Sequence, residues 1–72
     1  MKKINKIEIK INGKIKSIIR DTNLSKVLKN LKIPLNKVAI ELNEEIIDKK
    51  RLSVKILKKN DKIEIVHFIG GG

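Results

Sequence analysis

A single dipeptide, Asn12-Gly13, constrains the fold of this chain more than any other feature, because it separates two segments of alternating polarity. Residues 6–11 alternate charged side chains with isoleucines, which is the pattern of a half-buried β-strand. Asn-Gly is favoured in type I′ turns because both central residues of that turn need a positive φ. Residues 14–19 are therefore predicted to return as a second strand, and the chain is predicted to open with a β-hairpin.

A short helix is predicted after the hairpin, because apolar residues recur there at helical spacing: Leu24, Val27, Leu28 and Leu31. Thr22 is the predicted N-cap, since its hydroxyl can accept a hydrogen bond from a free backbone N–H, and Asn23 is nearly as suitable. Pro34 cannot continue a helix and restricts the residue before it to extended geometry. We therefore expect the helix to end near Leu31 or Lys32.

The second half of the chain is predicted to supply three more strands, at residues 38–42, 45–48 and 62–68. Residues 49–60 fit neither period, and we expect a loop with about one helical turn that places Leu52 and Leu57 under the core. The predicted fold class is α+β, with a mixed sheet of about five strands packed on one helix. In a β-grasp arrangement of this kind, the first and last strands would pair in parallel at the centre of the sheet.

The composition excludes several classes of functional site. The chain has 72 residues, no cysteine and one histidine, so disulfides, thiolate or multi-histidine metal sites and a cysteine nucleophile are excluded. We expect no metal site, and we cannot assemble a nucleophile–base pair, so an enzyme is the least expected class. Apolar runs are short, so no membrane span is predicted, and we expect an intracellular, cytoplasmic protein.

A formal net charge of +10 suggests an acidic partner, and nucleic acid is the usual first candidate. However, isoleucine, lysine and asparagine share A/T-rich codons, so base composition alone can produce this charge. The lysines are scattered along the chain, and Phe68 is the only aromatic residue, whereas single-strand binders use aromatic platforms. We therefore do not expect a nucleic-acid partner, although a small basic nucleic-acid-binding module stays as a distant alternative.

The last three residues are the most informative for function, because three of the four glycines of the chain are Gly70, Gly71 and Gly72. One interpretation is a frayed terminus. The other is an arm without side chains that enters a slot too narrow for any other residue. Residues 1–68 are then the folded domain and residues 69–72 a flexible tail. The α-carboxylate of Gly72 would be the reacting group, and a partner would activate it as a mixed anhydride with a nucleotide.

Two segments, 38–43 and 61–72, closely resemble the sulfur carrier family of thiamine biosynthesis, the ThiS family. The similarity covers residues 7–72, and residues 61–72 are its most specific part. This resemblance implies a ubiquitin-like β-grasp fold. It also implies that Gly71 and Gly72 correspond to the terminal diglycine of the family and that Gly70 extends it.

The resemblance further implies a cycle in which the domain is a co-substrate of other enzymes. An E1-like adenylyltransferase would use ATP and Mg to adenylate Gly72, and sulfur from a donor protein would convert the adenylate to a thiocarboxylate. The thiocarboxylate would then give its sulfur to thiazole synthase. The domain itself would bind no cofactor.

A partner-binding surface is predicted beside the tail, at Val66, Phe68 and Ile69. Phe68 can lie either in the core or, with Val66, in an exposed apolar patch where a partner docks. His67 has no catalytic partner in the sequence and is interpreted as structural or incidental. The acidic residues near position 45 are interpreted as a solvated face of a turn.

Related functions would use the same fold and tail. A sulfur carrier for molybdopterin synthesis or tRNA thiolation and a protein-conjugating modifier are therefore the other candidates. The preference for thiamine depends on the resemblance of residues 61–72.

Overall fold

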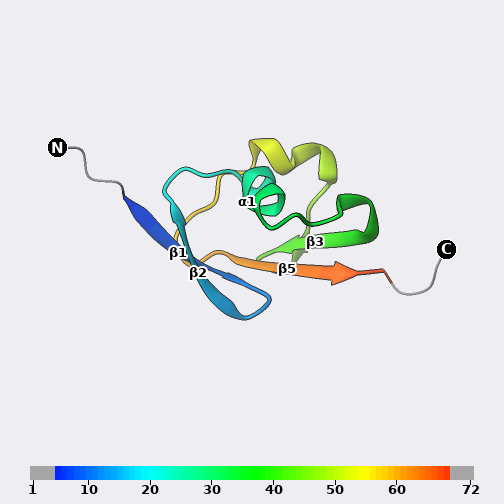
Figure 1. Ribbon diagram of the computed structural model, residues 1–72, viewed down its shortest axis with the longest axis horizontal. Coiled ribbons are helices and arrows are strands. Elements are labelled where there is room, and N and C mark those ends of the chain that lie inside the picture. The colour runs from blue at the N-terminus through cyan, green and yellow to red at the C-terminus, as the bar shows by residue number, and fades with distance from the viewer. Residues whose placement is uncertain (1–4, 69–72) are drawn as a thin grey trace.

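The Asn12-Gly13 turn joins β1 (Lys6–Ile11) to β2 (Lys14–Ile19) in the computed structural model, which describes residues 5–68 (Figure 1). The two strands pair antiparallel along their whole length. Asn12 and Gly13 have φ values of 49° and 82°, as a type I′ turn requires. An added Cβ at Gly13 would meet no atom within 4 Å, so backbone conformation rather than space explains the glycine. The predicted hairpin is confirmed.

The five strands form one mixed sheet in the order β2-β1-β5-β3-β4. The remaining strands are β3 (Val38–Leu42), β4 (Glu45–Ile46) and β5 (Lys62–His67). β5 pairs in parallel with β1 and antiparallel with β3, so the first and last strands meet at the centre of the sheet as predicted. The predicted α+β class and β-grasp arrangement are confirmed.

The fourth strand is shorter than predicted. It ends at Ile46 instead of Asp48, although the Ile47 N–H still donates to the Ile40 carbonyl at 2.9 Å. The side chain of Asp48 instead accepts a hydrogen bond from the Lys50 N–H at 2.9 Å and caps the 3₁₀ segment η2 (Lys49–Val54). Because Asp48 is the N-cap of η2, it does not continue the strand.

The helix α1 (Leu24–Asn30) begins one residue later than the predicted cap allowed. Asn23 is the N-cap, and its Oδ1 accepts from the Lys26 N–H at 2.7 Å. The prediction that Thr22 is the N-cap was wrong, because its polar groups make other hydrogen bonds. Its hydroxyl donates to the Ile19 carbonyl, and its own carbonyl accepts from the Leu57 N–H at 2.9 Å.

The end of the helix agrees with the prediction. Leu31 is the C-cap, and Lys32 follows with a φ of 58°, a left-handed conformation common at helix ends. Pro34 then precedes the short 3₁₀ segment η1 (Leu35–Lys37), which leads into β3.

The core lies between α1 and one face of the sheet (Figure 1). It contains apolar side chains from the strands, α1, η2 and the loop that follows η2: Ile9, Ile18, Leu24, Val27, Leu28, Val38, Ile40, Leu42, Leu52, Leu57, Ile63 and Ile65. Leu52 and Leu57 are buried under this core as predicted. The opposite face of the sheet, here called the outer face, has no helix over it among residues 5–68. Within the same range, no helix is long and apolar enough to cross a membrane.

Candidate functional site

The central strand β5 leads the chain out of the sheet. Only the first two residues of β5, Lys62 and Ile63, pair with β1. The pairing of β5 with β3 continues as far as His67. The Phe68 N–H then donates to the Lys37 carbonyl at 2.9 Å. The last described residue is therefore held in line with β5, and Figure 1 shows the strand pointing away from the β1–β2 hairpin.

Two asparagines from the hairpin turns hold β5 in place. The Ile65 N–H, which lies beyond the end of β1, donates to Asn12 Oδ1 at 2.7 Å. The Lys62 N–H donates to Asn43 Oδ1 at 2.9 Å. The sequence predicted only a turn role for Asn12, because a local pattern of residues does not indicate a contact with Ile65, which is 53 residues away along the chain.

The alternation of side chains along β5 is confirmed by burial. Ile63 and Ile65 are buried, whereas Val66 and Phe68 are 48% and 59% exposed. The interpretation of Phe68 as a core residue is wrong, because α1 covers only the face opposite to it. Val66 and Phe68 therefore lie on the outer face, as the partner-surface interpretation required.

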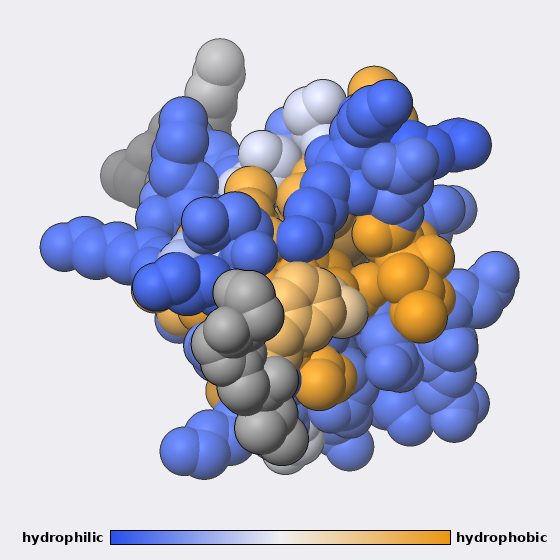
Figure 2. Space-filling model, turned by 90° about the vertical axis from the view of Figure 1, so that its right-hand side faces the viewer, coloured by the Kyte–Doolittle hydropathy of each residue, from blue (hydrophilic) through white to orange (hydrophobic). Residues whose placement is uncertain are grey.

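An apolar surface surrounds these two side chains. Val66 lies opposite Ala39 in the β3–β5 register, and Ile46 lies opposite Glu41 on the next strand. Ile46 is 76% exposed. Figure 2 looks onto this end of the molecule and shows hydrophobic side chains together, bordered by hydrophilic ones. We call the group the outer patch and define it as Ala39, Ile46, Val66 and Phe68.

The ring of Phe68 has a cationic neighbour. Lys49 Nζ lies 5.5 Å from the ring centroid, which is within the range of a cation–π contact, and such contacts contribute about 0.5–1 kcal/mol at exposed sites. Lys49 begins η2, so this contact links the end of β5 to the segment after β4. The sequence offers no signal for this pair.

The outer patch borders two carboxylates, Glu41 and Glu64, in a chain with a net charge of +10. Glu41 and Glu64 are directly opposite each other in the β3–β5 register, and like charges in that position repel.

The predicted tail residues lie outside the described range. Ile69, Gly70, Gly71 and Gly72 follow the last described residue, Phe68, so their roles stay predictions. The described part of the site consists of the outer patch and the end of β5 that precedes the tail.

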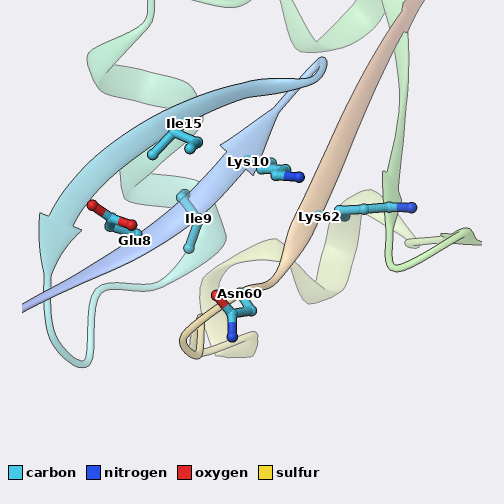
Figure 3. A pocket seen from close by; sticks show the side chains of 6 residues that line it. All are labelled: Glu8, Ile9, Lys10, Ile15, Asn60 and Lys62. Carbon is cyan, nitrogen blue, oxygen red and sulfur yellow. The ribbon is translucent and has the colours of Figure 1, made fainter.

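Two other features of the described residues are His67 and a hollow beside β1. His67 is exposed at the end of β5, and no group of three or more metal-ligating side chains occurs among residues 5–68. A hollow of about 200 Å³ lies beside β1, and Figure 3 shows the side chains that line it. Its lining residues are Glu8, Ile9, Lys10, Ile15, Asn60 and Lys62. They include no serine, threonine, cysteine or histidine, and the charged residues among them are Glu8, Lys10 and Lys62.

Comparison with known proteins places this arrangement in a family. The ThiS family model matches residues 9–72. The chain is 38% identical over 65 residues to the sulfur carrier protein ThiS of Bacillus subtilis, covering 89% of this chain and 98% of that protein. The crystal structure of the thiamine biosynthesis protein ThiS from Geobacter metallireducens superposes with a TM-score of 0.81 at 28% identity, covering 92% of this chain and all of that one.

A second kind of relative is much longer. The chain is 35% identical over 66 residues to the thiazole synthase of Magnetococcus marinus, covering 92% of this chain but 20% of that protein. A thiazole synthase from Paramagnetospirillum magneticum matches with the same coverage. The chain therefore spans about a fifth of the length of these two relatives. Because the ThiS family model matches residues 9–72 and the strands have the order of a β-grasp sheet, the chain belongs to the ThiS family.

Proposed function

We propose that this chain is a sulfur carrier in thiamine biosynthesis and that the carboxyl group of Gly72 carries the sulfur as a thiocarboxylate. The observation that supports this most strongly is the match of the ThiS family model through residue 72. The similarity over nearly the whole of a curated sulfur carrier adds to it. The described part of the chain is in keeping with a carrier, because it has an exposed apolar group of side chains, the outer patch, at the end of β5.

The chemistry would take place in partner enzymes. An E1-like adenylyltransferase, which would bind ATP and Mg, would join the Gly72 carboxylate to AMP and release pyrophosphate. Sulfur supplied by a donor protein at the oxidation level of sulfide would then displace AMP and leave a thiocarboxylate. The chain itself would be a co-substrate that contributes its terminus and its recognition surface.

Thiazole synthase is the proposed acceptor of the sulfur. Two proteins with that name contain a segment similar to this chain within a much longer polypeptide. A carrier domain and its acceptor in one polypeptide would meet at high effective concentration. This arrangement supports a direct encounter between the present chain and a separate thiazole synthase.

Carriers for molybdopterin synthesis or tRNA thiolation would use the same terminal chemistry. The names of the relatives favour thiamine, since the solved structure is called a thiamine biosynthesis protein and shares the name ThiS with the sulfur carrier of Bacillus subtilis. We therefore propose thiazole formation as the pathway that receives the sulfur.

Intact-mass analysis tests the proposed function. The chain is incubated with the E1-like enzyme of its own organism, ATP, Mg and a sulfur donor, and the expected product has one oxygen replaced by sulfur. Adding thiazole synthase and its other substrates should return the mass to its starting value. If the mass of the chain stays unchanged although the same E1-like enzyme forms a thiocarboxylate on another carrier protein, the proposal is refuted.

Replacement of Phe68 tests the outer patch. Phe68→Ala should raise the KM of the activating enzyme for the carrier on the order of tenfold, because exposed aromatic side chains are frequent anchors of interfaces. The melting temperature should change little, since Phe68 is 59% exposed. Ile56→Ala is the matched control, because Ile56 is also exposed but precedes β5 in a separate loop. An unchanged KM for a folded Phe68→Ala chain would exclude docking through this ring.

A further inference from the structure

The second strand, β2, is one edge of the sheet and is long enough to accept another strand. It pairs with β1 along all six of its residues and has no other neighbour in the described sheet. The opposite edge, β4, has only two residues. Edge strands present a row of unpaired N–H and C=O groups, which serve as a template for strand addition.

The hydrogen-bond pattern shows which groups of β2 point outward. The Arg20 N–H donates to the Asn5 carbonyl at 2.9 Å, and residues opposite each other alternate between bonded and non-bonded pairs in antiparallel strands. The residues that direct their backbone groups toward the open edge are therefore Ile15, Ser17 and Ile19. The Ile19 carbonyl accepts from Thr22, so Ile15 and Ser17 keep both groups available among the described residues.

A basic groove runs along this open edge. A hollow of about 310 Å³ lies between β2 and α1, and three lysines line it: Lys6, Lys16 and Lys26. Its other lining residues are polar or apolar, and none of the described ones is acidic. An added strand would direct one set of its side chains toward this groove, because side chains alternate between the two faces of a sheet.

The other face of the same edge carries two exposed isoleucines beside the charged side chains of β1. Ile15 and Ile19 are 65% and 56% exposed, and they lie on the outer face, opposite Lys10 and Lys6 of β1. Figure 3 shows Ile15 on β2 beside Lys10 and Glu8. An added strand would place its second set of side chains beside these two isoleucines.

We propose that β2 and the groove beside it bind an extended peptide segment in which acidic and apolar residues alternate. The acidic side chains would lie near the lysines of the groove, the apolar ones against Ile15 and Ile19, and the backbone would pair with Ile15 and Ser17. This is recognition by strand addition, in which main-chain hydrogen bonds supply affinity and alternate side chains supply specificity.

A second copy of the chain fits this edge poorly. Each copy carries a net charge of +10, and pairing two β2 strands would bring their lysines together, which is a common way to prevent edge-to-edge association. A nucleic-acid backbone would contact the lysines but would use neither the outward N–H groups nor the exposed isoleucines. The acidic peptide is the occupant that uses all three features.

The inference goes beyond the proposed carrier function, because this edge is separate from the outer patch. Figure 1 places the β1–β2 hairpin on the opposite side of the molecule from the end of β5. A partner could therefore hold the carrier by β2 while the end of β5 stays accessible to an enzyme.

A short fluorescein-labelled peptide of alternating glutamate and valine tests the proposal by fluorescence anisotropy and by amide chemical shifts of the intact chain. We expect shifts at Ile15, Ser17 and Lys26. A peptide of the same composition in scrambled order should bind at least several-fold more weakly. Equal binding of the two peptides, or an oligonucleotide that shifts the same amides more strongly, would overturn the proposal.

Two sets of variants separate backbone pairing from charge. Ser17→Pro removes an outward N–H without removing a bond to β1, and peptide binding should weaken on the order of tenfold. Ser17→Ala, which keeps the N–H, should bind as the unmodified chain does. A chain with both Lys16→Glu and Lys26→Glu should bind the peptide more weakly by a similar factor. This charge-reversed chain tests the proposal even if Ser17→Pro disturbs the hairpin. Undiminished binding by the charge-reversed chain would refute the proposal.

Discussion

A chain that lacks Gly71 and Gly72 should retain its fold and yield no thiocarboxylate. The truncation removes the carboxyl group that we propose is adenylated, and a carboxylate on Gly70 would end two residues short of its usual reach into the partner. Described core residues extend only to Ile65, and the last described hydrogen bond of this strand is made by Phe68. Intact-mass analysis after incubation with the E1-like enzyme, ATP and a sulfur donor measures the effect.

An extended chain provides the matched control for this truncation. One alanine appended after Gly72 leaves all the glycines in place but moves the carboxylate onto a residue with a Cβ, which a slot that admits only glycine would reject. Both variants should give the same circular dichroism spectrum as the intact chain. Sulfur incorporation by either variant at the rate of the intact chain would contradict the assignment of Gly72.

Leu28→Ala should have the largest effect on stability. Leu28 lies on α1, is only 1% exposed and belongs to the cluster between helix and sheet. Truncating a buried leucine to alanine costs about 2–5 kcal/mol, whereas a domain of this size is stabilised by roughly 4–11 kcal/mol in total. We expect the urea midpoint to fall by a large fraction of its original value.

Val54→Ala is the control for this substitution, because Val54 is 66% exposed at the end of η2. Its free energy of unfolding should change by no more than about 0.5 kcal/mol. Equal losses for the two variants would mean that α1 does not carry the core that the structure shows.

The hairpin and the helix are predictable because their signals are local. Asn12-Gly13 adopts the positive φ values that a type I′ turn needs, and this requirement is met within the dipeptide. The stripe of Leu24, Val27 and Leu28 is buried as its spacing predicts. In both cases the determining residues are close neighbours along the chain.

The helix cap shows where local reasoning fails. Thr22 and Asn23 are both good caps by type, and the choice between them depends on a distant segment. The Leu24 N–H donates to the Lys55 carbonyl and the Thr22 carbonyl accepts from Leu57. This pairing forms an isolated antiparallel bridge between Asn23 and Ile56 and holds Asn23 in extended backbone, so the helix starts after Asn23.

The amino-acid sequence alone determined the secondary-structure order, the glycine ending and the two-residue alternation along β5, because each depends on neighbouring residues. Only the tertiary structure decided that Phe68 faces solvent, since one helix covers one face of the sheet and leaves the other open. It also decided that Asn12 holds Ile65 and that β2 forms an open edge beside a basic groove. These features join residues far apart in the chain, so no local pattern of polarity or spacing encodes them.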